Sequence, residues 1–143
     1  MQEGPMVLIK DLIPSLCSEM NISEVPEENE EKISTLLFTE GVTLYIQDLS
    51  PGFYIWTTIV SCPTKNKEDL FMHLMEANLF GQGTGGSVIS LDENEKFLTL
   101  SLALAYEVNY KEFKEAVEDF VNYVLYWRSE IEAILEKAKQ NIL

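Results

Sequence analysis

The sequence predicts an α+β fold, in which helices pack on a twisted antiparallel sheet within a single domain over residues 1–143. Apolar residues recur at helical spacing in three separate stretches, and five other stretches are rich in β-branched, aromatic or alternating apolar residues. No internal repeat or linker divides the chain. The resulting order, α-β-β-β-α-β-β-α, has too few crossovers for a doubly wound parallel sheet.

Spacings of three and four between apolar residues predict the first helix within residues 7–20. Pro14 lies inside this stretch, and proline lacks an amide donor and clashes one turn back. We therefore expect the helix to begin near Lys10 or to kink. The acidic stretch 21–32 has no sustained period and reads as a loop.

The next three stretches, 34–41, 42–49 and 52–62, predict an antiparallel meander of strands. In the third strand, both alternating faces are apolar: Phe53, Ile55, Thr57 and Ile59 on one, and Tyr54, Trp56, Thr58 and Val60 on the other. We expect both faces of this strand to contact other residues.

Helical spacing returns after Asn66, which is a plausible N-cap with Asp69 three residues later, and the second helix is expected to end at Gly81. Strands at 86–92 and 96–106 are expected to form a hairpin.

A long third helix is expected to follow this hairpin. Asn109 and Glu112 approximate a capping box at its start, and its apolar period continues almost to the last residue.

The stretch from Gly81 to Gly86, GQGTGG, has the spacing of a dinucleotide-binding fingerprint. Such a loop places phosphate at the N-terminus of the helix that follows it. Here a helix precedes the glycines and a strand follows, so the nearest helix end carries partial negative charge. The glycines are therefore interpreted as a helix C-cap and connector that needs positive φ angles.

Charge and composition exclude several classes of partner. Ten basic residues face twenty-four acidic ones, giving a formal charge of −14, which disfavours nucleic acid and anionic membranes. No apolar run is long enough to span a bilayer, and the N-terminal residues do not resemble a signal peptide. We expect a cytoplasmic protein without membrane insertion. Cys17 and Cys62 lack the spacing of a zinc site or disulfide framework.

Nothing in the sequence indicates catalysis. The single histidine, His73, has no HExxH spacing, no serine lies in a GxSxG motif, and the paired glutamates fall in the predicted acidic loop. We expect no enzyme activity, metal or cofactor. The apolar surplus of the sheet instead favours a protein partner, and an edge strand is a template for an extended peptide.

Two stretches, 70–104 and 113–131, resemble the type III secretion chaperones of the CesT/SycE family. The first carries Leu74, Asn78 and Leu79, then the small-residue connector, and then Leu91-Asp92 before the leucine-alternating strand 98–104. The second is similar to the C-terminal helix of the family.

The resemblance implies a small acidic protein of the bacterial cytoplasm that binds the N-terminal segment of a secreted effector in extended form, without ATP. It also implies a homodimer, or a heterodimer with a related chaperone. The implied effector-binding residues come from the first helix and the first three strands: Leu12, Leu16, Leu36, Phe38, Leu44, Phe53, Ile55 and Trp56. The implied dimer interface comprises Phe71, Leu74, Met75, Leu79, Val88 and Ile89.

Two other functions stay open at this point. One is an α+β adaptor or scaffold subunit that binds a folded partner, and the other is a small nucleotide-dependent enzyme.

Overall fold

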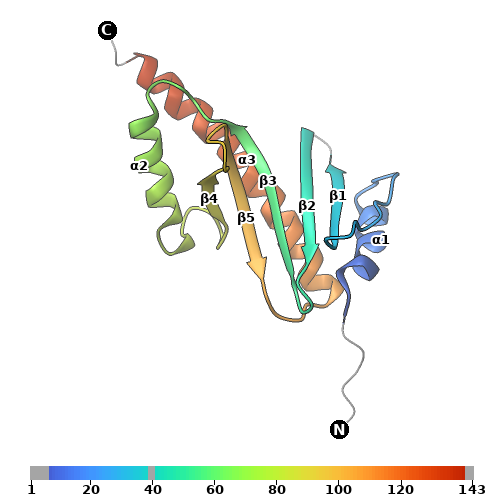
Figure 1. Cartoon of the computed structure of the whole chain (residues 1–143). Helices are drawn as coiled ribbons and strands as arrows, with labels where there is room; N and C mark the ends of the chain where they lie inside the picture. Colours follow the sequence, from blue (N-terminus) through green and yellow to red (C-terminus); the bar gives the residue numbers. More distant parts are fainter. Residues whose placement is uncertain (1–6, 39–40, 141–143) are drawn as a thin grey trace. The chain divides into compact units, whose positions relative to one another are not determined.

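The computed structural model describes residues 7–38 and 41–140 (Figure 1). Its helices are α1 (Ile9–Glu19), α2 (Lys67–Asn78) and α3 (Tyr110–Gln140), with a 3₁₀ turn over Leu79–Gly81. Its strands are β1 (Ile33–Phe38), β2 (Val42–Asp48), β3 (Phe53–Ser61), β4 (Val88–Leu91) and β5 (Phe97–Leu104). The predicted element order and the α+β fold class are confirmed. No helix in the described part of the chain is long and apolar enough to cross a bilayer.

The strands form one sheet in the order β1-β2-β3-β5-β4. The pairs β1–β2, β2–β3 and β4–β5 are antiparallel, with Leu36 opposite Leu44, Ile46 opposite Ile55, and Ile89 opposite Leu100. Strands β1 and β4 are therefore the two edges of the sheet as described. The predicted strand 34–41 is shorter in the structure, since β1 ends at Phe38 and residues 39–40 lie outside the described part.

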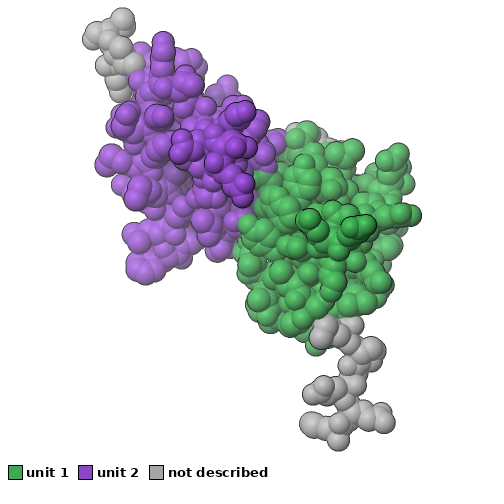
Figure 2. Space-filling model, viewed as in Figure 1, with its two compact units in different colours: residues 1–57, 102–118 green, residues 58–101, 119–143 purple. Residues whose placement is uncertain are grey.

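The chain divides into two compact units, which Figure 2 shows in green and purple. The first unit contains residues up to 57 together with 102–118, and the second contains 58–101 together with residues from 119 onward. Strands β3 and β5 and helix α3 contribute residues to both units.

The core of the first unit lies between one face of the sheet, α1 and the start of α3. Phe53 and Phe113 meet edge to face with ring centroids 5.1 Å apart, and both are fully buried. Helix α1 begins at Ile9 and contains Pro14, so the prediction of a start near Lys10 holds. Its first amide is bound from outside the helix: the Ile9 N–H donates to Oδ2 of Asp48, 3.2 Å away.

The core of the second unit joins α2, β4, β5 and the later part of α3. Leu70 and Leu74 of α2 are buried, as are Leu98 of β5 and Val124 of α3. Arg128 of α3 donates from Nε to the Ile59 carbonyl at 2.8 Å, which fastens the helix to the end of β3.

The two predicted helix caps have different outcomes. The capping box of α3 is confirmed: the Glu112 N–H donates to Oδ1 of Asn109 at 2.8 Å, and the Asn109 N–H donates to Oε1 of Glu112 at 3.2 Å. The N-cap role of Asn66 is wrong. Asn66 does precede α2, but its φ of 59° is left-handed and its side chain makes no capping hydrogen bond. A side chain caps a helix from an extended backbone, which Asn66 does not have.

Candidate functional site

The outer side of β1 borders a groove in the first unit. Residues 20–26, which follow α1, form one wall, and Thr35 and Leu37 of β1 form the other, around a volume of about 450 Å³. Leu37 is 67 % exposed and Val25 is 49 % exposed. Strand β1 pairs with β2 alone, so its other side is a sheet edge. Asn29 already bonds the N–H and C=O of Ile33 at the start of this edge, which leaves the part beside Thr35 and Leu37 for an added strand. We call this feature the β1 groove.

Three aromatic side chains form a row on the less buried face of β2 and β3. Trp56 stacks on Tyr45 at 5.5 Å and on Tyr54 at 5.1 Å between ring centroids. All three are half-buried, whereas the alternating residues Leu44, Ile46 and Phe53, Ile55 are fully buried. The expectation that both faces of β3 contact other residues therefore holds for this end of the strand, although unequally.

The structure places the predicted effector-binding residues in two groups. Five of them are core residues with at most 1 % exposure: Leu16, Leu36, Leu44, Phe53 and Ile55. The other three are half-buried: Leu12, Phe38 and Trp56. Effector contact by any of the eight stays a prediction, and only the second group is accessible without movement of the core.

The sequence analysis missed Val25 and Leu37 as surface residues. Val25 lies in a stretch read as a charged loop, and Leu37 is on the strand face opposite the selected Leu36. The sequence held no signal for them, because the position of β1 at the sheet edge follows only from the strand order of the structure.

A second set of exposed apolar side chains lies on α2, on the 3₁₀ turn over Leu79–Gly81 and on β4, all in the second unit. It comprises Met72, Met75, Leu79, Phe80, Val88 and Leu91, with exposures from 39 % for Leu91 to 89 % for Phe80. We call it the α2 apolar surface. A cleft of about 170 Å³ opens on it. Phe71, Leu74, Met75 and Ile89 line that cleft together, so the structure brings four of the six predicted interface residues to one place.

The remaining two predicted interface residues, Leu79 and Val88, are each more than half exposed. Leu74 and Ile89 are buried beneath the surface, and Phe71 is half-buried. Met72 and Phe80 were missed, because Met72 lies off the helical face selected from the sequence and Phe80 falls in a connector. Pairing through this surface stays a prediction.

The connector between α2 and β4 holds this surface in a defined shape. Gly81, Gly85 and Gly86 all have positive φ, as predicted for the connector. The predicted glycine C-cap and the predicted helix end at Gly81 are wrong, because α2 ends at Asn78 with Leu79 in an extended conformation as its C-cap. The Gly83 N–H donates to the Ala77 carbonyl at 3.0 Å, and Trp127 donates its indole N–H to the Gly83 carbonyl at 2.9 Å. Helix α2 runs into the glycines, so its C-terminus faces them, contrary to the geometry of a phosphate loop.

The only ion pair between α1 and α3 in the described ranges joins Glu19 to Lys114. The hydrogen bond from Lys114 holds the pKa of Glu19 below its usual range, and the same bond raises the pKa of Lys114. Burial raises the pKa of the Cys17 thiol. Within residues 7–38 and 41–140, no cluster of three or more His, Cys, Asp or Glu residues is arranged to hold a metal ion.

The family model described as Tir chaperone protein (CesT) family matches residues 11–128. The chain belongs to the CesT family. The match begins inside α1, spans the whole sheet and includes α3 as far as Arg128.

This CesT-family chain is similar to a curated protein of Chlamydia pneumoniae, CPj0713/CpB0740, with 25 % identity over 126 residues that cover 87 % of this chain and 96 % of the relative. Among solved structures, its fold resembles a chain of the ExsC–ExsE complex, with a TM-score of 0.70 and 16 % identity over 85 % of this chain and 91 % of that one.

Two further structures share the fold. A chain of the ExoU–SpcU heterodimeric complex from the type III secretion system of Pseudomonas aeruginosa has a TM-score of 0.64 and 15 % identity, covering 85 % of this chain and 96 % of that one. A chain of the HopA1–SchA chaperone–effector complex has a TM-score of 0.63 and 10 % identity, covering 85 % and 93 %.

Proposed function

We propose that this protein is a cytoplasmic type III secretion chaperone that binds the N-terminal segment of a secreted effector in extended form. The observation that carries the proposal is the unpaired edge of β1 beyond Ile33, beside the β1 groove with its exposed Leu37 and Val25. Membership of the CesT family supports it, as do the shared folds of a chaperone–effector complex and of the ExoU–SpcU complex.

An extended segment can pair its backbone with the open side of β1 and so lengthen the sheet by one strand. Alternate side chains of the added strand then point to the same face as Leu37 and Thr35. An apolar side chain on that face would fill the β1 groove and cover Leu37 and Val25. Backbone pairing would supply affinity for many sequences, and the groove would select apolar anchors.

This mode of binding needs neither a nucleotide nor a catalytic group. The effector is held by strand addition and apolar burial, and both are available in the folded chaperone. The proposed role is to keep the effector segment soluble and unfolded until secretion, and the charge of −14 favours the solubility of the pair.

We further propose that the chaperone acts as a homodimer through the α2 apolar surface. Phe80 is 89 % exposed and Met75 is 72 % exposed, and side chains of this size are seldom gathered on the surface of a monomer. A two-fold axis would set this surface against its own copy, as in an isologous interface.

The effector proposal is tested by co-expression with N-terminal segments of secretion substrates encoded beside the chaperone gene. Leu37→Asp is expected to abolish co-purification of the segment, because it puts a charge at the β1 groove. The control is Phe97→Asp, which places the same charge at an exposed apolar residue of the second unit, outside both the β1 groove and the α2 apolar surface, and is expected to retain the segment. Retention of the segment by Leu37→Asp, or binding only of a folded partner domain, would support an adaptor role instead.

The dimer proposal is tested by sedimentation at micromolar concentration. Phe80→Asp and Met75→Asp are expected to sediment as monomers, whereas Val25→Asp, an equally drastic change at an exposed apolar residue of the first unit, is expected to leave the dimer intact. A wild-type protein that sediments as a monomer throughout would contradict the proposal.

A further inference from the structure

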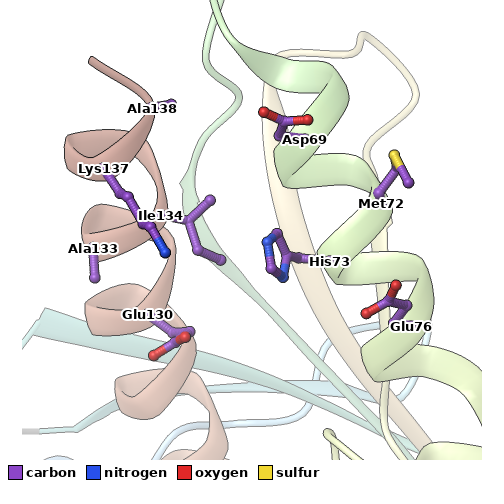
Figure 3. A pocket seen from close by; sticks show the side chains of 9 residues that line it. All are labelled: Asp69, Met72, His73, Glu76, Glu130, Ala133, Ile134, Lys137 and Ala138. Atoms are coloured by element: carbon purple, nitrogen blue, oxygen red, sulfur yellow. The ribbon is translucent and has the colours of Figure 1, made fainter. Parts of the chain in front are cut away.

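A groove of about 380 Å³ lies between α2 and the C-terminal part of α3, entirely within the second unit (Figure 3). Asp69, Met72, His73 and Glu76 of α2 line one side, and Glu130, Ala133, Ile134, Lys137 and Ala138 of α3 line the other. Figure 3 shows the His73 ring and the Ile134 side chain extending toward each other across the space. We call it the α2–α3 groove.

This groove is separate from the two surfaces already described. Only Met72 belongs both to its lining and to the α2 apolar surface, and no residue of the β1 groove takes part. On the α3 side, two of the apolar lining residues, Ala133 and Ala138, have small side chains. They leave room for another backbone to approach closely.

The charges of the groove indicate what it can bind. Three carboxylates, those of Asp69, Glu76 and Glu130, border it, against the single ammonium of Lys137. Opposite charges are attracted to such a site and like charges are repelled. A second copy of this chain, which also carries a charge of −14, would bring further carboxylates toward these. A cationic partner fits the groove better than a second copy does.

Both walls of the groove are helices, whose backbone groups are bonded within the helix and offer no edge for strand addition. A helix laid into the groove, with apolar side chains spaced along one face, is a mode of peptide binding that two helical walls can accommodate. We propose that the α2–α3 groove binds a basic amphipathic helix of a partner protein, with an apolar anchor on Ile134 beside Ala133 and Ala138 and with lysine or arginine beside Asp69, Glu76 and Glu130.

The probe is a fluorescein-labelled synthetic helix of four turns, with leucines at positions i, i+4 and i+7, lysines flanking them and alanine or glutamine elsewhere. Its binding to the full chain is followed by fluorescence anisotropy at physiological ionic strength, where weak long-range attraction is screened. A peptide of the same composition with a scrambled order is expected to bind at least tenfold more weakly. Equal binding of the two peptides would overturn the proposal.

Two chaperone variants test the location. Glu76→Lys with Glu130→Lys reverses the charge of the groove, and Ala133→Trp fills it without changing charge. Each is expected to weaken binding of the leucine–lysine helix at least tenfold. The matched controls are Glu27→Lys with Glu30→Lys, which changes net charge equally at exposed residues of the first unit, and Ser129→Trp, which adds the same side chain to α3 outside the groove lining.

The controls are expected to change the affinity less than twofold. Equal weakening by the Glu27 and Glu30 reversal would show unspecific charge attraction and overturn the proposal. So would a change of oligomeric state, or loss of the effector segment, on reversal of Glu76 and Glu130, because the groove would then belong to the dimer or to the effector site. Leu37→Asp, which tests the effector site, is expected to bind the probe normally.

Discussion

The side chain of Asn78, the last residue of α2, makes both hydrogen bonds that the backbone of Ile89 in β4 offers on one side. Oδ1 of Asn78 accepts from the Ile89 N–H, and Nδ2 donates to the Ile89 carbonyl, each at 2.8 Å. The amide thus substitutes for a neighbouring strand at this point of the edge strand β4. The end of α2 is thereby fixed to the sheet beneath the α2 apolar surface.

Asn78→Ala removes both bonds and leaves partly buried backbone groups without partners. At about 1 kcal/mol for each bond, the free energy of unfolding is expected to fall by about 2–3 kcal/mol. Urea denaturation followed by circular dichroism measures the change. Asn78→Asp keeps the acceptor but turns a carboxylate oxygen toward the Ile89 carbonyl, and it is expected to be at least as destabilising as Asn78→Ala. Unchanged urea midpoints in both variants would show that the side-chain amide of Asn78 is not needed to hold the end of α2 against β4.

The glycine connector offers a matched pair of substitutions. Gly85 has φ +62°, and an added Cβ would lie 2.3 Å from Cε2 of Tyr123, whereas Gly86 has φ +90° with nothing within 4 Å. Gly86→Ala is expected to cost roughly 1–2 kcal/mol from backbone strain alone. Gly85→Ala is expected to cost more, because the Tyr123 ring must also move.

The same comparison in a Tyr123→Leu background isolates the steric part of that cost. The excess penalty of Gly85→Ala over Gly86→Ala, measured by urea denaturation, is expected to shrink when the ring is absent. An excess that survives the loss of the ring would assign it to the backbone.

The ion pair between Glu19 and Lys114 predicts a specific pH dependence. Lys114 lowers the pKa of Glu19, so the stabilisation is present above the unfolded pKa of about 4.3 and is lost as the pH falls through the lower folded value. Glu19→Gln is therefore expected to destabilise the protein at neutral pH and to match wild type in strong acid. Thermal melts at several pH values measure the difference.

At alkaline pH, the stabilisation from this ion pair changes with pH in the opposite direction. Glu19 raises the pKa of Lys114, so that contribution is present below the unfolded pKa and is lost as the pH rises through the higher folded value. The double variant with Lys114→Met should be less destabilised at neutral pH than the two single changes summed. Simple additivity would mean that the pair is not coupled.

The two thiols are expected to react at different rates with Ellman's reagent. Cys17 is fully buried in the first unit, and burial raises its pKa, so both access and thiolate content are low. Cys62 is half-buried. The Cys62→Ser variant, which retains Cys17, should react slowly until urea opens the fold, whereas Cys17→Ser should react at once. Equal rates in native buffer would contradict the placement of Cys17 in the core.

Sequence periodicity was sufficient for the order of the elements, because helical and strand spacings differ clearly in stretches as long as α3 and β5. It also located the Asn109 box and the hairpin between the strands at 86–92 and 96–106. In the turn of this hairpin, the Asp92 carboxylate accepts from the Lys96 and Phe97 amides at 2.8 and 3.1 Å. These features depend on residues close in sequence.

The choice between apolar faces was not available from the sequence. In β3, Phe53 and Ile55 are as apolar as Tyr54 and Trp56, and only packing against α3 decides which pair is buried. The N-cap prediction at Asn66 was wrong for a similar reason. An asparagine side chain caps a helix only from an extended backbone, whereas the backbone of Asn66 is left-handed. Surface residues such as Phe80 depend likewise on tertiary structure.

The two methionines of the α2 apolar surface are open to oxidation. In the single chain, Met72 is 63 % exposed and Met75 is 72 % exposed, so peroxide can reach both thioethers whenever the two copies are apart. Oxidation to the sulfoxide would turn two adaptable apolar side chains into polar ones without changing the chain's charge. Oxidative stress would therefore act on the surface through which we propose that two copies meet, and a methionine sulfoxide reductase could restore it.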